Sequence, residues 1–243
     1  MHNEHDLPLP WGAFRAANRF RRAVRQFNST PIPEDEIRDL LEEATLAPSS
    51  GNLQPYELHW VREPALKASI AQACNGQKAA TSAADLIVVV ASPEIAKQTA
   101  KAQLAYVEAS TKLGVDAKAY YRKQMGMFQR ILGLGSSAFW SPLVFLAGLI
   151  RPSLSLLPIG HIGSRHWAAR NAVFAAHTLI LGAAAKGIYS CPMEGFSAPK
   201  VAKLLGLPRG SVIPLVIALG YRADDARIEE RWRRPLTDIV VRH

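Results

Sequence analysis

Two short runs of β-branched and aliphatic residues constrain the fold of this chain more than any other feature. They read LIVVVA over residues 86–91 and IPLVIAL over residues 213–219. Because neither run alternates with polar residues, each predicts a strand that is covered on both faces. Tyr56–Val61 alternates and predicts a half-buried strand, and a brief strand is expected around Ile188–Cys191.

Helical patterns separate these strands without strict βαβ regularity, which predicts an α+β fold with one sheet. We expect one domain over residues 1–243. Gly187 is expected to end the longest helix, and Ser197 to cap the start of the last one. The segments with helical patterns are residues 13–27, 34 to just before Pro48, 64–73, 94–113, 116–132, 165–186 and 197–205.

The most apolar stretch runs from Ser137 to Ile150, contains Pro142 and ends at Arg151. It is shorter than the roughly 18–20 apolar residues that a membrane-spanning helix needs. We therefore predict a buried wall or an interface here, and no membrane span. The first residues are polar and lack the apolar centre of a secretory signal, so the cytoplasm is the expected compartment.

The chain carries 29 Lys and Arg against 20 Asp and Glu, a net charge of +9. Such an excess indicates an anionic partner, which could be a nucleic acid, a membrane or a phosphorylated small molecule. The two cysteines, Cys74 and Cys191, have no metal-ligand spacing, so we expect neither a zinc module nor a disulfide scaffold, and no metal site.

Four segments could carry chemistry, although each alone has an ordinary structural explanation. Arg21, Arg22 and Arg25 would share one side of a helix and could bind a phosphate, or could form a solvated basic face. Residues 47–56 combine hydroxyls and amides between two prolines and could be a turn-rich helix end. The others are residues 191–196, between a strand and a helix, and the basic run at 231–235.

Taken together and in this order, the segments resemble the FMN-dependent nitroreductase family, the NAD(P)H:flavin oxidoreductase-like superfamily. The motifs that carry the resemblance are RRAVRQF at 21–27, PIP at 31–33, PSSGNLQPY at 48–56, PMEGF at 192–196, LGLP at 205–208, LGY at 219–221 and RRPL at 233–236. The resemblance covers about residues 17–240. It is weakest over residues 92–164, where a variable helical and apolar segment is expected.

The resemblance implies two arginine groups around an FMN phosphate. Arg21, Arg22 and Arg25 match residues that hold the phosphate and the pyrimidine edge, and Ala23 stands where the family usually has Ser. Near the C-terminus Arg231 and Arg233 fit the phosphate-binding pair best, and Arg234 fits after a small shift of register.

Three further segments match family positions near the flavin ring. The loop that reaches the flavin from the other subunit matches Pro48, Ser49, Ser50 and Asn52, and Tyr56 replaces the more usual Trp. The flavin-edge contacts match Asn75 and Lys78. The segment that lies over the isoalloxazine matches Pro192, Met193, Glu194 and Gly195, with backbone N–H groups near flavin N5.

The implied fold is a central, mainly antiparallel sheet flanked by helices in an intertwined homodimer with its sites at the interface. The implied reaction is ping-pong hydride transfer from NADH or NADPH through flavin N5 to nitroaromatic, quinone or related acceptors. No side chain is an obvious catalyst, and Glu194 and Gly195 are only expected nearby. The alternatives are another reaction on the same fold, such as dehalogenation, enone reduction or flavin fragmentation, and a basic nucleic-acid-binding protein. The acceptor and the choice of nicotinamide stay open.

Overall fold

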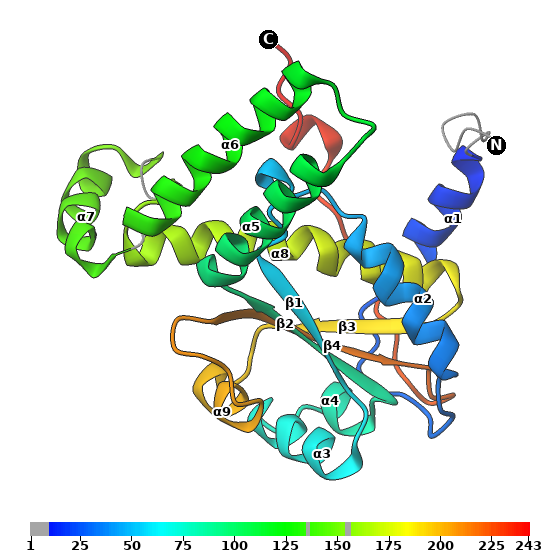
Figure 1. The fold of residues 1–243 in the computed structure, drawn as a ribbon. Coiled ribbons are helices and arrows are strands. Elements are labelled where there is room, and N and C mark those ends of the chain that lie inside the picture. Colours follow the sequence, from blue (N-terminus) through cyan, green and yellow to red (C-terminus); the bar gives the residue numbers. More distant parts are fainter. Residues whose placement is uncertain (1–9, 135–136, 154–156) are drawn as a thin grey trace.

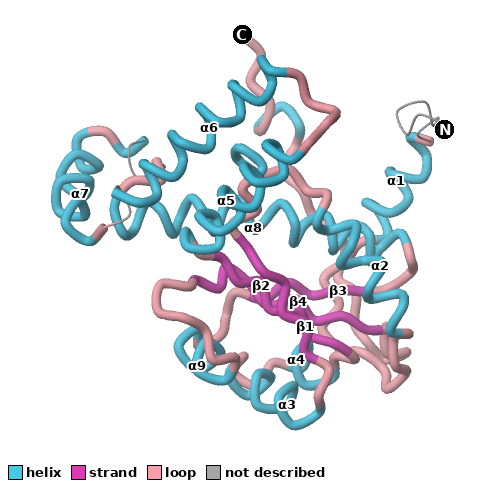
Figure 2. Tube along the Cα trace, viewed as in Figure 1, coloured by secondary structure: helices cyan, strands magenta, loops and turns pink. Residues whose placement is uncertain are grey.

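A computed structural model describes residues 10–134, 137–153 and 157–243. A four-stranded sheet lies between two layers of helices (Figures 1 and 2). Its strands are β1 (Tyr56–Val61), β2 (Asp85–Ala91), β3 (Tyr189–Met193) and β4 (Val212–Gly220). All three pairings are antiparallel in the order β1-β2-β4-β3, so the two apolar runs occupy the centre. The predicted α+β fold with a mainly antiparallel sheet is confirmed.

The two faces of the central strands bury alternate side chains in two hydrophobic clusters. Ile87 and Val89 belong to one cluster, and Leu86, Val88 and Val90 belong to the other. This explains the absence of polar residues in the run, because both sets of side chains are covered. The covering helices are α2 (Glu34–Thr45), α5 (Pro93–Ala109) and α8 (Gly160–Ala185) on one face, and α3 (Pro64–Ala73), α4 (Lys78–Ser82) and α9 (Ala198–Leu204) on the other.

Pro214 stands inside the central strand β4, although proline cannot donate a ladder hydrogen bond. The register between β2 and β4 shifts between Val89 and Ala91, opposite this part of β4. On the other side the pairing with β3 ends at Met193 and Val216. Pro214 therefore lies at a sheet irregularity and beyond the end of β3, where a missing N–H is tolerated.

The prediction of a helix through residues 13–27 is wrong beyond Phe20. Helix α1 spans Trp11–Phe20, and Arg21 has extended backbone angles. The following segment lies beside β3, with a parallel bridge between Ala23 and Ser190 and a 3.1 Å bond from the Val24 N–H to the Ser190 carbonyl. Pairing with a strand edge therefore replaces the helical hydrogen bonds, and the expected helical face that Arg21 and Arg25 would share does not form.

Some helix ends lie where the sequence predicts them and others do not. Gly187 ends α8 as predicted, with φ +74° and the Ile188 N–H bonded to the Ala183 carbonyl at 2.8 Å. Ser197 precedes α9, but its side chain makes no cap bond, and its N–H donates to the Ala73 carbonyl instead. Helix α8 begins five residues before the predicted start, α5 ends at Ala109 rather than at residue 113, and α4 was not predicted.

The apolar stretch from Ser137 to Ile150 is not a buried wall of this chain. It forms a 3-10 turn (Ala138–Trp140) and helix α7 (Ser141–Ile150), between α6 (Val115–Leu134) and α8. Phe145 is 61% exposed and Ile150 is 83% exposed. Within the described ranges, no single helix is long and apolar enough to cross a membrane; a pair covering residues 115–133 and 138–150 passes the length and hydropathy criteria together, with a 74° bend.

Gly220 is expected to tolerate no side chain. A Cβ there would lie 2.8 Å from two ring carbons of Phe27, which is only 5% exposed. Because the ring is packed on all sides, Gly220→Ala should cost about 1–3 kcal/mol of stability, measured by urea unfolding. The matched control is Gly126→Ala on α6, where a Cβ meets no atom within 4 Å. That change should leave stability unchanged or raise it by up to about 1 kcal/mol. Equal unfolding midpoints for the two variants would contradict the clash.

Candidate functional site

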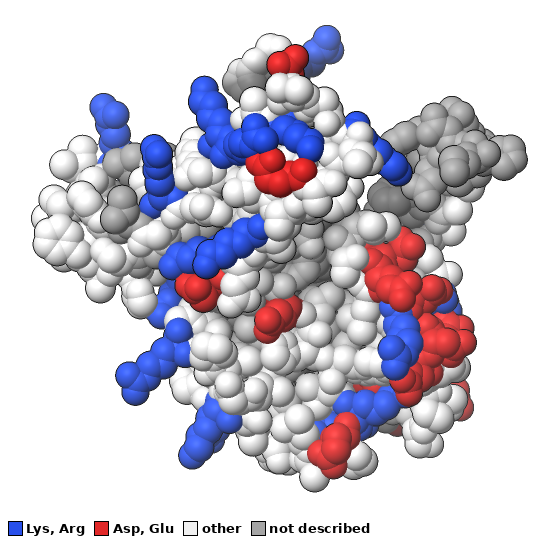
Figure 3. All heavy atoms as spheres, in the orientation of Figure 1, with Lys and Arg blue, Asp and Glu red and all other residues white. Residues whose placement is uncertain are grey.

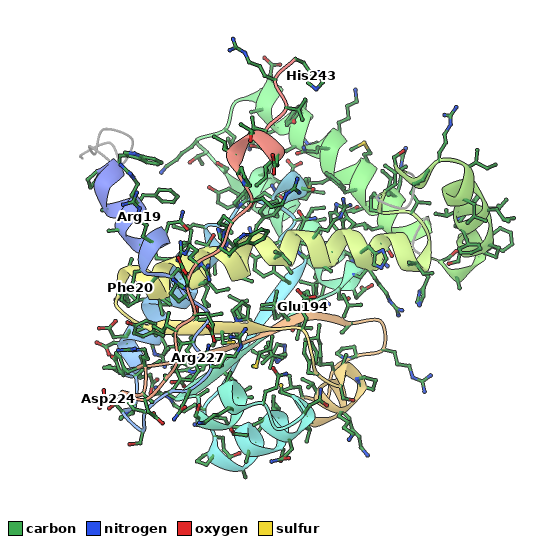
Figure 4. All side chains as sticks on the ribbon, turned by 180° about the vertical axis from the view of Figure 1, so that it is seen from behind. Arg19, Phe20, Glu194, Asp224, Arg227 and His243 are labelled. Atoms are coloured by element: carbon green, nitrogen blue, oxygen red, sulfur yellow. The ribbon has the colours of Figure 1, made fainter. Side chains whose placement is uncertain are left out.

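The two arginine clusters predicted from opposite ends of the sequence meet in the structure. The C-terminal tail, residues 222–243, returns to the end of α1 (Figure 4). There the Arg231 guanidinium donates to the backbone carbonyls of Asn18, Arg19 and Arg21 at 3.2, 3.0 and 2.5 Å. Arg22 in turn donates to the Glu229 carbonyl of the tail. Because the last carbonyls of a helix carry partial negative charge, a guanidinium is well placed to bind them.

Four guanidinium groups crowd one another here: those of Arg21, Arg22, Arg231 and Arg233. Burial lowers the pKa of Arg21 most, and the charges of Arg233 and Arg22 lower it further. The pKa of Arg231 is lowered in the same way, first by burial and then by the other three arginines. We call these four residues the arginine cluster.

The arginine cluster has no acidic partner among the described residues. None of the ion pairs among the described residues includes a member of the arginine cluster. The nearby Glu229 carboxylate pairs with Arg227 at 2.7 Å instead. Like charges held together without a counter-charge repel one another, and a bound anion would relieve that repulsion. Arginine forks match phosphate oxygens, so the donor set fits an FMN phosphate.

The remaining predicted arginines lie apart from this group. Arg234 donates to the Asp238 carbonyl at 2.7 Å, within the turn Leu236–Asp238 near the C-terminus. Arg25 lies near Cys191, whose pKa is raised by burial and lowered to a smaller extent by the Arg25 charge. The exposed Ala23 contributes its backbone to the bridge with β3. Of the three C-terminal arginines, the structure therefore places Arg231 and Arg233 in the cluster.

The loop after β3 forms the second part of the site. Pro192 is exposed on β3, Met193 is buried in the core, and Glu194 and Gly195 are exposed. Among the described hydrogen bonds, the N–H groups of Glu194 and Gly195 have no protein acceptor. Two adjacent free N–H donors on an exposed loop can bind an acceptor atom of a ligand.

The Gly195 carbonyl is held from the turn between α3 and α4. It accepts hydrogen bonds from Asn75 Nδ2 at 3.0 Å and Gln77 Nε2 at 2.7 Å. Asn75 and Gly76 have φ angles of +59° and +62°, which turn the chain toward the loop. Asn75 thus positions Gly195, and Lys78 begins α4 with its side chain exposed. Gln77 was missed, and its only sequence signal is its place between Asn75 and Lys78.

The loop at residues 48–54 is attached to another part of the chain. The Ser50 N–H donates to Oδ1 of Asn171 on α8 at 2.7 Å, and Asn171 is 4% exposed. Inside the loop, Ser49 Oγ accepts from the Gln54 N–H, and Asn52 Oδ1 accepts from the Gln54 amide. Sequence reasoning missed Asn171, because a single amide in a long apolar helix indicates no particular partner.

No hydrogen bond or ion pair among the described residues joins this loop, with the exposed Pro48 and Asn52, to the arginine cluster or to Gly195. The predicted site is therefore in two places within one chain. The arginine cluster and the Glu194–Gly195 loop lie along the β3 edge, where residues 21–27 pair with the strand. The 48–54 loop lies on α8.

Side chains that could act as nucleophiles or metal ligands do not gather near these groups. Burial raises the pKa of Cys74 to about 11, so this thiol stays protonated at neutral pH. In the described part of the chain, no three His, Cys, Asp or Glu side chains are placed to hold a metal ion. The groups available to a ligand here are guanidinium groups, amides and backbone donors.

Fold and site together define a protein that can hold a phosphorylated ligand along the edge of an antiparallel sheet. The chain belongs to the nitroreductase family, whose model matches residues 19–221. It is 28% identical over 236 residues to a Thermus thermophilus protein named NADH dehydrogenase, covering 97% of this chain and 98% of that protein. It is 30% identical over 216 residues to protein DrgA of Synechocystis, covering 88% and 87%.

Solved structures share the fold. A Bacillus subtilis structure described as the nitroreductase ydfN superposes with a TM-score of 0.77 at 24% identity, covering 96% of this chain and 99% of that one. An Exiguobacterium sibiricum structure described as a nitroreductase in complex with FMN has a TM-score of 0.71 at 21% identity, covering 95% and 97%. The similarity to these structures extends to nearly the whole chain.

Proposed function

We propose that this protein is an FMN-dependent oxidoreductase that takes electrons from NADH or NADPH and reduces nitroaromatic, quinone or related acceptors. The observation that carries the proposal is the arginine cluster. Its members come from positions about 210 residues apart and meet without an acidic partner in the described part of the chain. Membership of the nitroreductase family and the names of the relatives support the same function.

Different residues would bind the phosphate and the ring of the cofactor. Arg21, Arg22 and Arg233 would bind the phosphate, while Arg231 fixes the tail to α1 through three carbonyls. The free N–H groups of Glu194 and Gly195 would donate to the flavin ring, since Asn75 and Gln77 already engage the Gly195 carbonyl. When bound, FMN supplies the redox chemistry, so the protein needs no nucleophilic side chain of its own.

A homodimer with its sites at the interface is part of the proposal. Large apolar side chains remain exposed in the tail and on α1, among them Trp232 at 75% and Trp11 at 67%. A second copy that covered them would bury apolar surface on a scale that suits an obligate interface. It would also bring the partner's 48–54 loop to the arginine cluster and complete the site. The proposed compartment is the cytoplasm, where both nicotinamide reductants are present.

Flavin binding tests this function directly. The purified protein, incubated with FMN and desalted, is expected to show the absorption bands of oxidised flavin. Riboflavin, which lacks the phosphate, should bind at least about tenfold more weakly, because charge-assisted hydrogen bonds are lost. Anaerobic NADH or NADPH should then bleach the visible band. A protein that takes up no FMN, but shifts a labelled oligonucleotide in a salt-dependent manner, would instead be a nucleic-acid-binding protein.

A further inference from the structure

Helix α7 presents its bulky apolar side chains to solvent and its small ones to the protein. The residues that face inward are Ser141, Val144, Ala147 and Gly148, and those that face outward are Pro142, Leu143, Phe145, Leu146, Leu149 and Ile150. Leu146 and Leu149 are 59% and 68% exposed. Between α7 and the start of α8 lies an apolar pocket of about 250 Å³, lined by Val144 and Gly148 and, at its edge, by Phe145, Leu149 and Ile162. A surface helix of a water-exposed protein has the opposite arrangement, because burial favours the larger apolar side chains.

The outward face continues beyond α7 in both directions along the chain. Phe139 and Trp140 precede the helix and are 76% and 41% exposed. Ile162, at the start of α8, is 56% exposed. The end of α6 and the start of α8 lie beside α7, at the end of the molecule farthest from α1 (Figure 1). These residues form one apolar surface that contains no charged side chain, and we call it the α7 face.

Basic residues surround the α7 face. Residues 125–170, which include α7, contain four arginines and no acidic residue. Arg130 lies near the end of α6, Arg151 directly follows α7, and Arg165 lies near the start of α8. None of these three takes part in an ion pair with the described residues. Figure 3 shows blue side chains projecting around the white surface of this end.

We propose that the α7 face docks on the surface of an anionic lipid bilayer. Leu146, Leu149 and their neighbours would enter the boundary between headgroups and acyl chains, as the apolar face of an interfacial helix does. Trp140 has the ring type that favours this depth, and Arg130, Arg151 and Arg165 would contact lipid phosphates. The helix has ten residues and is about 15 Å long, which suits an interfacial position and is half of a membrane span.

The charge distribution favours lipid over a second copy of the chain. If two α7 faces met across a two-fold axis, the ring of Arg130, Arg151 and Arg165 on each protomer would lie near the like-charged ring of the other. Such like-charge contacts oppose association, whereas an anionic bilayer offers both an apolar interior and a complementary charge. The proposed homodimer instead has its interface at the tail and α1, where Trp232 and Trp11 are exposed. This inference does not depend on the flavin assignment, because α7 lies away from the arginine cluster and from the β3 edge.

Co-sedimentation with vesicles tests the proposal. The full chain is mixed with vesicles of phosphatidylcholine alone or with one quarter phosphatidylglycerol. We expect it to pellet with the anionic vesicles and to be released by high salt. The double change Leu146→Glu with Leu149→Glu should lower the partition coefficient at least tenfold. The matched control, Tyr106→Glu with Val115→Glu, adds the same two charges at the end of α5 and the start of α6, at sites that are 71% and 81% exposed, and should change the partition coefficient less than threefold.

A further variant separates charge from apolar insertion. Arg130→Gln with Arg151→Gln should reduce binding to anionic vesicles about tenfold, because each cation near a charged surface contributes separately. Circular dichroism and thermal unfolding check that all variants are folded. The proposal is overturned if the wild-type chain stays in the supernatant, if neutral vesicles bind it equally well, or if the α7 variant and the control bind alike. It is also overturned if the α7 changes alter the mass in light scattering while vesicles have no effect, since a second copy would then cover the face.

Discussion

Arg21→Ala is expected to weaken FMN binding by about 10- to 100-fold, the largest effect on cofactor affinity that we expect from a single substitution. A hydrogen bond to a charged group contributes about 1.5–3 kcal/mol, and 1.4 kcal/mol corresponds to a factor of ten in the dissociation constant. Arg21 is partly buried within the arginine cluster, where its charge is screened less than that of an exposed side chain. The measurement is the quenching of flavin fluorescence on titration with protein.

The control is Arg234→Ala, which removes an equal charge from a guanidinium that is engaged with the Asp238 carbonyl. It should change FMN affinity less than threefold. A second readout separates cofactor binding from folding. Burial, and then the charges of Arg233 and Arg22, lower the pKa of Arg21, so its positive charge is unfavourable in the folded apoprotein. The Arg21→Ala apoprotein should therefore unfold at the same temperature as the wild type or at a higher one. Equal loss of FMN in both variants would remove Arg21 from the phosphate site.

Asp85→Ala is expected to destabilise the fold by about 2–4 kcal/mol, because it leaves partly buried donors without their buried acceptor. Asp85 is 1% exposed and begins the central strand β2. Its carboxylate accepts from Trp60 Nε1 and Arg62 Nε, both at 2.8 Å, and from Arg62 Nη2 at 3.2 Å. Arg62 also donates to the Ile32 carbonyl and stacks over the Trp60 ring, so one carboxylate holds several segments. The melting temperature should fall by roughly 5–15 °C.

Two further variants test the cause of that loss. Glu34 lies 4.0 Å from Arg62, but its side chain is 55% exposed, so Glu34→Ala should cost less than about 1 kcal/mol. Asp85→Asn keeps an acceptor for Trp60 and should be intermediate between Asp85→Ala and the wild type. If Asp85→Ala and Glu34→Ala have the same melting temperature, the Asp85 carboxylate does not hold these segments together.

The net charge of the chain has more than one origin. Taken from the sequence, the value of +9 indicates an anionic partner without saying where it binds. The arginine cluster carries part of the excess and is proposed to bind a phosphate, and a further part lies in residues 125–170, which include α7 and contain four arginines and no acid. A single number thus combines two surfaces, one suited to a small phosphorylated ligand and one suited to an extended anionic surface.

The sequence by itself determined the centre of the sheet and predicted which segments form the site. Residues 86–91 and 213–219 have no polar face, so they had to be covered on both sides, and they form β2 and β4. Gly187 ends α8 because it can adopt a positive φ, a property of one residue. Features set by a few consecutive residues were therefore predictable.

Only the tertiary structure decided how these segments come together. Residues 21–27 leave the helix because their backbone groups pair with distant segments: Ala23 and Val24 with Ser190 of β3, and Phe27 with Arg222. Arg231 donates to carbonyls at the end of α1, and Gln77 donates to the Gly195 carbonyl. Asn171 accepts from the Ser50 N–H. Each pair joins segments far apart in the sequence. The outer face of α7 is exposed because none of the residues that the structure describes packs over it. Hydrogen bonds and packing between distant segments depend on which segments the tertiary fold brings together, and the local sequence pattern does not specify those pairs.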